Sequence, residues 1–199
     1  KILNNGVDLS IFTNNISQKE KRVQLNIPQN AFVVIHVGRF DPIKNHKFLI
    51  EIFQKIKEKK PEAYLLMVGK GETEQQIEEK LKSAGLEDSY SILHDRTDVA
   101  EILQASDAAV FPSFSEGLPL TLIEMQAAGL PCVASNGVSR DACISNKLQF
   151  LNLELDAEAW ADQLLKLCED TTPIQYSRIE EWDIRHNVKQ LEKMYEEAM

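Results

Sequence analysis

Short apolar runs alternate along this chain with longer stretches in which apolar residues recur at helical spacing. Runs rich in Val, Ile and Leu, without polar alternation, are typical of strands buried on both faces of a parallel sheet. Runs of this kind lie at residues 31–38, 63–68, 90–94, 108–111, 132–135 and 148–151.

The stretches between these runs are expected to be helices. A short charged helix is predicted at 17–25, before the first strand, and Asn45 is expected to cap the helix after that strand. Gly85 is expected to end the helix after the second strand. Two amphipathic helices, at 156–169 and 184–197, close the chain. Their inward-facing residues are predicted to be Trp160, Leu164 and Leu167, then Val188, Leu191 and Tyr195.

This strand–helix alternation predicts an α/β fold, a doubly wound parallel sheet with right-handed crossovers. The expected Rossmann-like strand order is 3-2-1-4-5-6. We expect residues 1–199 to form one domain, with an interdomain segment at 1–15, the Rossmann-like core at 16–152 and C-terminal helices at 153–199. Since the chain opens on Lys1 and not on Met, it reads as a piece of a longer protein.

Composition limits the classes of partner that the protein could bind. A hydrophobic content of 43% and a charged content of 27% are ordinary for a globular protein. The net charge of −9 argues against a nucleic-acid partner, because no basic stripe could meet a phosphate backbone. The three cysteines lack CxxC spacing, which suggests neither zinc nor a disulfide framework and favours a reducing, cytosolic setting. No apolar run has membrane-spanning length.

Residues 113–131 carry the clearest chemistry. The predicted helix from Pro119 onward is apolar nearly all round, yet it contains Glu124, and Glu116 lies in the loop before it. A helix N-terminus offers free N–H groups and a positive dipole end, which together form an anion site. An anion site flanked by two acceptors suits the diphosphate, ribose and hexose of a nucleotide sugar. Alternatively, Glu116 is solvated and Glu124 belongs to a structural ion pair.

Cations follow the predicted first strand. Ligands of open parallel sheets bind at the carboxyl ends of strands, where Arg39 and Lys44 could neutralise a diphosphate without a metal. Alternatively, Arg39 pairs with Asp41 and Lys44 is solvated. The turn at 69–71 is a weak phosphate signal, since no full glycine-rich motif follows it. His36 reads as a core histidine.

Six short motifs follow one another along the chain: NGVD at 5–8, VGRF at 37–40, PxKNH at 42–46, VGKG at 68–71, SDxxVFPS at 106–113 and EGLPLTLIExxAxGLP at 116–131. In these motifs the sequence resembles a known family, the C-terminal, donor-binding domain of retaining glycosyltransferases of the two-domain GT-B type, which includes capsule and lipopolysaccharide enzymes (group 1). The resemblance covers residues 5–152, and the last motif holds the family's E-x7-E signature.

The resemblance implies roles for individual residues. Arg39, Lys44 and Glu116 would be the catalytic set, with both cations on the diphosphate and Glu116 on the transferred sugar. Glu124 would bind the ribose hydroxyls. The other implied donor contacts are Gly38 at the strand exit, His94 and Arg96 near the base, and the backbone N–H groups of Gly117, Leu118 and Leu120. Many relatives have Gly where Pro119 stands, so one backbone donor is lost here.

The implied reaction moves a hexosyl group from a UDP- or GDP-linked donor to a sugar or lipid-linked glycan acceptor, with retention and without a metal or other cofactor. It would serve polysaccharide or glycan biosynthesis. The acceptor would bind an N-terminal domain absent from this chain, so the fragment should bind donor without turnover. A cytoplasmic location is implied, at the inner face of the membrane if the absent domain associates with it. Two rival interpretations are a non-catalytic nucleotide-sugar module on the same fold and an interaction module with a structural Glu pair.

Overall fold

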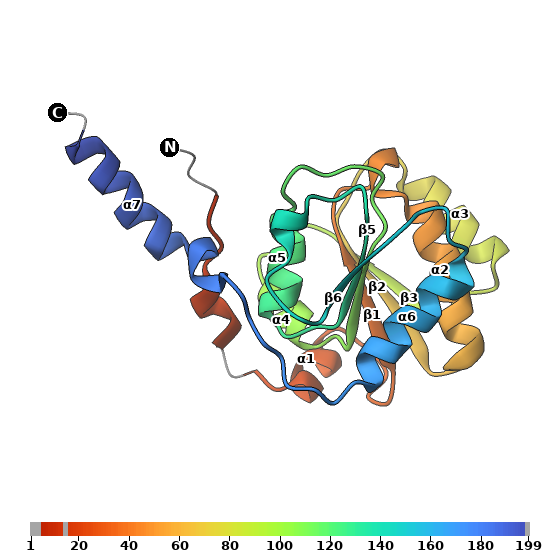
Figure 1. Ribbon diagram of the computed structural model, residues 1–199. Coiled ribbons are helices and arrows are strands. Elements are labelled where there is room, and N and C mark those ends of the chain that lie inside the picture. Colours follow the sequence, from red (N-terminus) through yellow and green to blue (C-terminus); the bar gives the residue numbers. More distant parts are fainter. Residues whose placement is uncertain (1–4, 14–15, 198–199) are drawn as a thin grey trace.

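A single parallel sheet of six strands forms the centre of the protein, in the order β3-β2-β1-β4-β5-β6 (Figure 1). The computed structural model describes residues 5–13 and 16–197. The predicted strand order and the α/β fold class are therefore confirmed. The strands are β1 (Phe32–Val37), β2 (Ala63–Val68), β3 (Tyr90–Leu93), β4 (Ala108–Phe111), β5 (Cys132–Ser135) and β6 (Leu148–Leu151).

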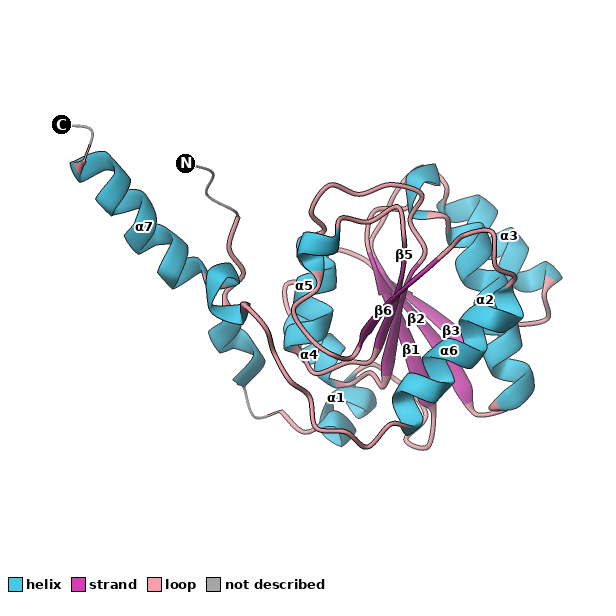
Figure 2. Ribbon diagram, viewed as in Figure 1, coloured by secondary structure: helices cyan, strands magenta, loops and turns pink. Residues whose placement is uncertain are grey.

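Helices cover both faces of this sheet (Figure 2). One face carries α2 (His46–Lys59), α3 (Glu74–Ser83) and α6 (Ala157–Glu169), and the other carries α1 (Gln18–Gln24), α4 (Val99–Gln104) and α5 (Leu120–Ala127). The remaining helical elements are 3-10 turns at Leu9–Thr13, Pro42–Lys44, Arg140–Ala142 and Ile179–Trp182, and the C-terminal α7 (Ile184–Glu196).

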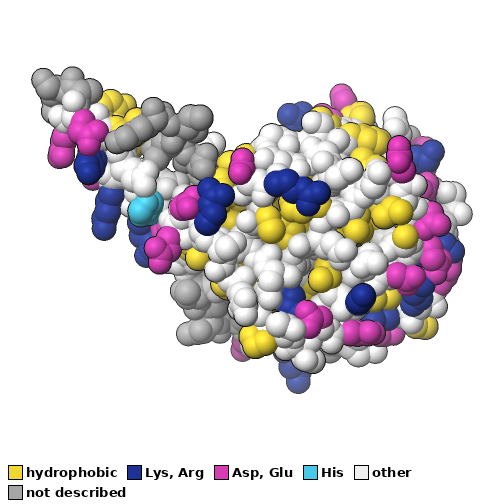
Figure 3. Space-filling model, in the orientation of Figure 1, with side chains coloured by type: hydrophobic (Ala, Val, Ile, Leu, Met, Phe, Trp, Pro, Cys, Tyr) yellow, Lys and Arg dark blue, Asp and Glu magenta, His cyan; other side chains and the backbone are white. Residues whose placement is uncertain are grey.

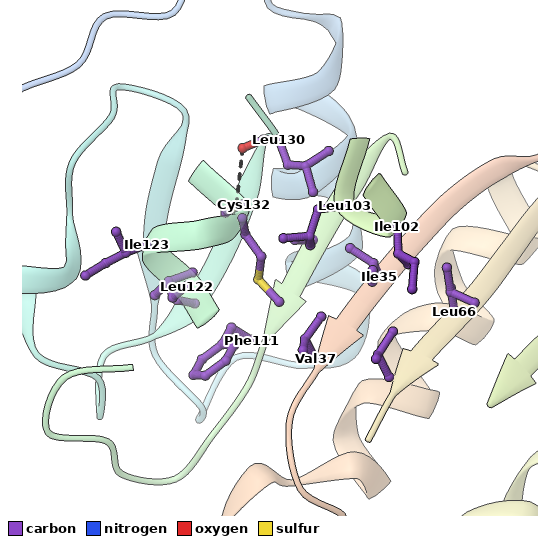
Figure 4. Close-up of a cluster of buried hydrophobic side chains, with 14 of the residues drawn as sticks. Ile35, Val37, Leu66, Ile102, Leu103, Phe111, Leu122, Ile123, Leu130 and Cys132 are labelled. Atoms are coloured by element: carbon purple, nitrogen blue, oxygen red, sulfur yellow. Dashed lines mark hydrogen bonds between the residues drawn. The ribbon is translucent and has the colours of Figure 1, made fainter. Parts of the chain in front are cut away.

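Strand β1 divides the hydrophobic core into two layers because successive strand side chains point to opposite faces. Val33, Ile35 and Val37 pack on the α4–α5 side, whereas Val34 packs on the α2–α6 side. Figure 4 shows the first layer, where Leu122 of α5 lies among strand side chains. Every residue of β4 is buried, which explains why the central strands lack polar alternation.

Buried cations fix α1 against the sheet. The Lys21 ammonium contacts Asp98 and Glu101 at 2.5 Å each while its side chain is only 3% exposed. Arg22 donates to Asp107 at 2.7 Å. Asp98 and Glu101 lie at the start of α4 and within it, and Asp107 lies between α4 and β4, so α1 is tied to the α4 side of the sheet. Arg96 contacts the same Asp98, and these bonds hold the pKa of Asp98 well below its usual range.

One of the two predicted helix-capping residues, Asn45, needs correction. Asn45 precedes α2 but makes no capping bond: its backbone is left-handed, with φ of 55°, and its side chain donates to the carbonyl of Pro112 at 3.2 Å. Gly85 does follow α3 in the left-handed region, with φ of 68°, as predicted. The Asn45 amide therefore joins two loops instead of ending a helix.

The outward position of α7 is the larger correction. Val188, Leu191 and Tyr195 were expected to face the core but are 48%, 40% and 67% exposed. Helix α7 projects from the body beside the N-terminal segment (Figure 1). Backbone bonds fix its base, because Val7 donates its N–H to the carbonyl of Trp182 and accepts from the N–H of Ile184. Helical periodicity identifies the apolar face of α7 but does not say what covers it.

On the face shown in Figure 3, acidic and basic side chains are interspersed over the surface. Among the described residues, no helix is both long and apolar enough to span a bilayer.

The exposure of α7 predicts that a substitution on this helix changes the free energy of unfolding far less than a substitution in the core. Replacing Val188 with Asp should change the free energy of unfolding by less than about 0.5 kcal/mol, since the side chain lies at the surface. Replacing the buried Leu164 of α6 with Ala should cost about 2–5 kcal/mol. Urea unfolding of both variants measures this, and a loss of more than about 2 kcal/mol for Val188→Asp would contradict the position of α7.

Candidate functional site

An ion pair between Lys44 and Glu116 lies where two strand-end loops meet. Lys44 belongs to the β1–α2 loop (residues 38–45) and Glu116 to the β4–α5 loop (residues 112–119). The Lys44 Nζ lies 2.6 Å from Glu116 Oε1, with side chains 15% and 18% exposed. The angles at Nζ and Oε1 do not meet those of a hydrogen bond, and Oε1 has no hydrogen-bond partner among the described residues. The contact is therefore chiefly electrostatic.

Backbone contacts hold the two loops in register. Phe114 donates its N–H to the carbonyl of Ile43 at 2.8 Å, beside the Asn45–Pro112 bond. Asp41 accepts from the N–H of Ile43 and fixes the 3-10 turn that carries Lys44. The ammonium lies 5.1 Å from the ring centre of Phe111, within range of a cation–π contact. The position of Lys44 is therefore set by the backbone and by packing.

Glu116 is fixed from its other side. It donates its N–H to Gly137 and accepts from the N–H of Ser139, each at 3.2 Å. A Cβ on Gly137 would lie only 2.1 Å from the carbonyl oxygen of Phe114, so only glycine permits this approach. The sequence alone gave no signal for Gly137.

Gly38 and Arg39 line a neighbouring cavity of about 280 Å³ at the ends of β1, β2 and β3. Arg39 is exposed and forms no ion pair within the described part of the chain, so the alternative pairing with Asp41 is absent there. Lys70 and Asp95, also in the lining, pair with each other at 2.5 Å. Arg39 is thus available to a ligand, whereas Lys44 is already paired.

The glycines at 69 and 71 have a packing role. A Cβ on Gly69 would lie 1.9 Å from the carbonyl oxygen of Gly38, and one on Gly71 would lie 2.2 Å from that of Phe40. The VGKG turn therefore lets the β2 loop cross closely over the β1 loop. Close backbone packing is thus sufficient to explain both glycines, and phosphate binding is not needed to explain them.

His94 and Arg96 lie at the end of β3, as predicted, but both have protein partners. The His94 Nε2 lies 2.7 Å from a Glu74 carboxylate oxygen. Arg96 binds both carboxylate oxygens of Asp98, which also holds Lys21. The guanidinium of Arg96 is therefore committed to structure in this conformation.

No described side chain caps the start of α5, where the sequence predicts an anion site flanked by Glu124. Within the described residues Glu124 makes no ion pair, and burial raises the pKa of its carboxyl. Pro119 occupies the N-cap position and provides no side-chain cap. The N–H groups of Gly117, Leu118 and Leu120 likewise donate to no described acceptor. The alternative of a structural Glu124 ion pair is thus not seen.

Two buried histidines lie beneath Lys44. His36 uses Nδ1 toward the carbonyl of Val110 at 2.9 Å, which leaves Nε2 as an unpartnered acceptor on the side of Gly38 and Lys44. His46 packs edge-on against His36, and neither of its ring nitrogens has a partner among the described residues. Burial lowers the pKa of His36 to about 4 and that of His46 to about 2, with the nearby Lys44 charge acting in the same direction. His36 is therefore the core histidine that was expected, although only one of its two ring nitrogens has a hydrogen-bond partner among the described residues.

Residues 17–185 match the family described as Glycosyl transferases group 1. The chain belongs to this family. The resemblance drawn from the motifs is thereby confirmed at the level of the family.

Individual relatives are similar over most of the chain. An Escherichia coli UDP-Gal:alpha-D-GlcNAc-diphosphoundecaprenol alpha-1,3-galactosyltransferase is 32% identical over 174 residues, covering 85% of this chain and 45% of the relative. An Arthrobacter D-inositol 3-phosphate glycosyltransferase is 29% identical, covering 83% and 41%. The chain thus spans a little under half the length of these curated relatives.

Solved structures share the fold. Anabaena Alr3699/HepE, crystallised with UDP and glucose, superposes with a TM-score of 0.82 at 21% identity, over 99% of this chain and 57% of HepE. The C-terminal domain of the Francisella tularensis group 1 protein LpcC superposes with a TM-score of 0.70 at 18% identity, over 96% of this chain and 98% of that domain. The Rossmann-like half of a GT-B fold is confirmed, and in LpcC it crystallised as a separate domain.

The buried histidines predict a loss of stability in mild acid. An unfolded histidine takes up a proton near pH 6.5, whereas His36 and His46 resist protonation while folded. The free energy of unfolding is therefore unaffected by these histidines above about pH 6.5. It falls as the pH drops toward their folded-state pKa, by up to about 2 kcal/mol per histidine at pH 5. Urea unfolding at pH 7 and pH 5 should show a smaller loss for His46→Phe than for the wild type. An unchanged pH dependence would contradict a neutral, buried His46.

Proposed function

We propose that this chain is the donor-binding domain of a retaining glycosyltransferase that transfers a hexosyl group from a nucleotide sugar to a hydroxyl acceptor in polysaccharide or glycan biosynthesis. The observation that carries the proposal is the Lys44–Glu116 ion pair beside the uncapped start of α5. A cation, an acid and free N–H groups converge at the carboxyl edge of a parallel sheet, where such folds bind ligands. A non-catalytic nucleotide-sugar module on the same fold is the alternative.

The diphosphate would lie between the two loops. Arg39 supplies a planar fork and Lys44 a point charge, and the N–H groups of Gly117, Leu118 and Leu120 add neutral donors. Two cations and a helix N-terminus can offset the charge that grows on the leaving nucleotide, so no metal is required. The uncapped α5 is already arranged for this contact.

Donor binding would exchange partners at the Lys44–Glu116 pair. The diphosphate gives Lys44 a new anionic partner, and the hydroxyls of the hexose give Glu116 new donors. A bare nucleotide supplies only the first of these partners, so the carboxylate loses its cation without replacement. The ion pair would therefore favour a full sugar donor over its nucleotide product.

The nucleoside end would extend over the α4–α5 side. Glu124 would accept hydrogen bonds from the ribose hydroxyls. Gly38, which has no side chain, would allow the ligand to approach the backbone closely. The loop that carries His94 and Arg96 would border the base. Because Asp98 holds the Arg96 guanidinium, we expect this loop to contribute mainly backbone contacts. HepE has been crystallised with UDP, which favours a UDP-linked donor over a GDP-linked one.

The acceptor, a sugar or lipid-linked glycan, would bind an N-terminal domain corresponding to the part of the relatives that this chain does not span. The exposed apolar face of α7, tied at its base to the N-terminal segment, would lie toward that domain. We expect the whole enzyme to work in the cytoplasm, with any membrane contact made by the other domain.

Removal of either cation should weaken nucleotide binding. Arg39→Ala and Lys44→Ala should each reduce affinity for UDP by about 1.5–3 kcal/mol, the usual range for hydrogen bonds to charged groups. Isothermal titration calorimetry on this chain measures the loss. Lys59→Ala is the matched control, because Lys59 is the last residue of α2, pairs with Asp162 of α6 and belongs to neither loop, so affinity should change little. Equal affinities in all three variants would contradict the placement of the diphosphate.

Glu116→Gln should separate the two ligands. Removing the carboxylate charge releases Lys44, so affinity for UDP should rise by about 1 kcal/mol, the scale of a partly exposed ion pair. From sequence alone no change was expected, because the ion pair could not be foreseen. Affinity for the UDP-sugar should fall relative to UDP. An equal loss for both ligands would place Glu116 at the wrong end of the donor.

An activity assay on the full-length protein distinguishes an enzyme from a non-catalytic nucleotide-sugar module. The full-length protein, given a UDP-sugar and a sugar acceptor, should release UDP, and the Lys44→Ala variant should not. Tight UDP binding without release in the presence of acceptors would favour the non-catalytic module.

A further inference from the structure

His36 of β1 is fully buried, and one of its ring nitrogens has no hydrogen-bond partner among the described residues. Its Nδ1 lies 2.9 Å from the carbonyl oxygen of Val110, and a carbonyl oxygen can only accept, so Nδ1 carries the proton. Burial lowers the pKa of the ring to about 4, which keeps it neutral at pH 7. In this form Nε2 is a bare acceptor. A buried acceptor without a donor is destabilising, so a donor within reach is a favourable partner.

The side chain of Lys44 runs past this nitrogen. A Cβ on Gly38 would lie 3.3 Å from His36 Nε2 and 3.3 Å from Lys44 Cε. Both atoms thus border the same point, and Gly38 has no side chain to separate them. After burial, the Lys44 charge is a further cause of the low pKa of His36, which also places the ammonium close to the ring. Since Nζ is one bond beyond Cε, rotation of the last bonds of Lys44 can turn an N–H toward Nε2.

Packed rings hold His36 in this orientation. Its ring centre lies 4.9 Å from that of His46 and 5.7 Å from that of Phe111. His46 in turn packs on Phe40 at 5.0 Å, and the Lys44 ammonium lies 5.1 Å from the centre of Phe111. The two histidines meet edge to face, and no hydrogen bond joins them. His46 therefore leaves the Nε2 acceptor to another donor.

A neutral acceptor and a carboxylate act differently on an ammonium. Glu116, at 2.6 Å, offsets the charge of Lys44. An imidazole nitrogen carries no charge, so it can fix the direction of the ammonium and leave the positive charge for an anion. Because an ammonium has three N–H groups, it can donate to a phosphate and to Nε2 at once. Water reaches little of the Lys44 side chain, which is 15% exposed.

From these contacts we propose that His36 is a positioning residue for Lys44. When a nucleotide diphosphate draws the ammonium away from Glu116, Nε2 of His36 accepts one of its hydrogen bonds and holds it against the phosphate. A charged partner is thereby exchanged for a neutral one, and the cation keeps its charge for the diphosphate. This inference rests on the proposed function, because it concerns the same cation and the same ligand.

Nitrogen NMR of the histidine rings tests the proposal in the wild-type chain. The spectrum should show His36 protonated on Nδ1 and bare at Nε2. Saturation with UDP should move the Nε2 resonance upfield, as happens when a bare imidazole nitrogen accepts a hydrogen bond. Uridine, which has no phosphate, should leave the resonance in place. An unmoved Nε2 resonance in UDP-saturated protein would overturn the proposal.

Calorimetry with UDP provides a second test. His36→Phe keeps a ring and removes the acceptor, and it should weaken UDP binding roughly tenfold. The same change in a Lys44→Ala background should cause no further loss, because His36 acts only through Lys44. His36→Gln should recover part of the affinity, since its amide oxygen can replace Nε2 as an acceptor. His46→Phe is the matched control, the same substitution on the neighbouring buried ring, and should leave UDP affinity nearly unchanged.

Two calorimetric results would reduce His36 to a packing residue and overturn the proposal: equal losses in His36→Phe and His46→Phe, or an undiminished further loss in the Lys44→Ala background. If His36→Phe does not fold, the nitrogen spectrum of the wild type decides. UDP binding by the wild type keeps the two hypotheses apart. Normal binding with an unmoved Nε2 resonance rejects the role of His36 alone, whereas absence of UDP binding rejects the proposed function and this inference with it.

Discussion

The candidate site of this domain centres on one electrostatic contact, the Lys44–Glu116 ion pair that joins the loops after β1 and β4. A partly buried cation and anion are each costly without a partner, so they stabilise each other while no ligand is present. The loops that carry them are fixed by backbone bonds through Ile43, Phe114 and Gly137. The contact therefore holds together the two side chains that we propose bind the donor, and it would have to open when a donor binds.

The parallel sheet makes this contact possible. Neighbouring parallel strands end at the same edge, and β1 pairs directly with β4, so residues more than seventy positions apart in sequence meet there. The close crossing of the β2 loop over the β1 loop, allowed by Gly69 and Gly71, stabilises that edge. The same edge brings together Arg39, its cavity at the ends of β1, β2 and β3, and the uncapped N-terminus of α5. The proposed donor site is thus a consequence of topology as much as of residue choice.

Much of this was accessible from sequence because strand and helix periodicities are local. The bounds of β2, β4, β5 and β6, the strand order, and the placement of Arg39, Lys44 and Glu116 at one edge followed from pattern alone. What could not be foreseen depends on through-space partners. The Asn45 amide reaches Pro112, Asp98 holds Arg96, and Glu116 pairs with Lys44. Helix α7 was misplaced for the same reason, since an apolar stripe does not identify its partner.

The most direct test of this account is a crystal structure of the chain with UDP bound. We predict that the Lys44 ammonium leaves Glu116 and contacts a phosphate oxygen of UDP, with Arg39 on the same diphosphate and the start of α5 pointing toward it. An intact Lys44–Glu116 pair, with UDP bound elsewhere, would contradict the central claim that this ion pair marks the donor site.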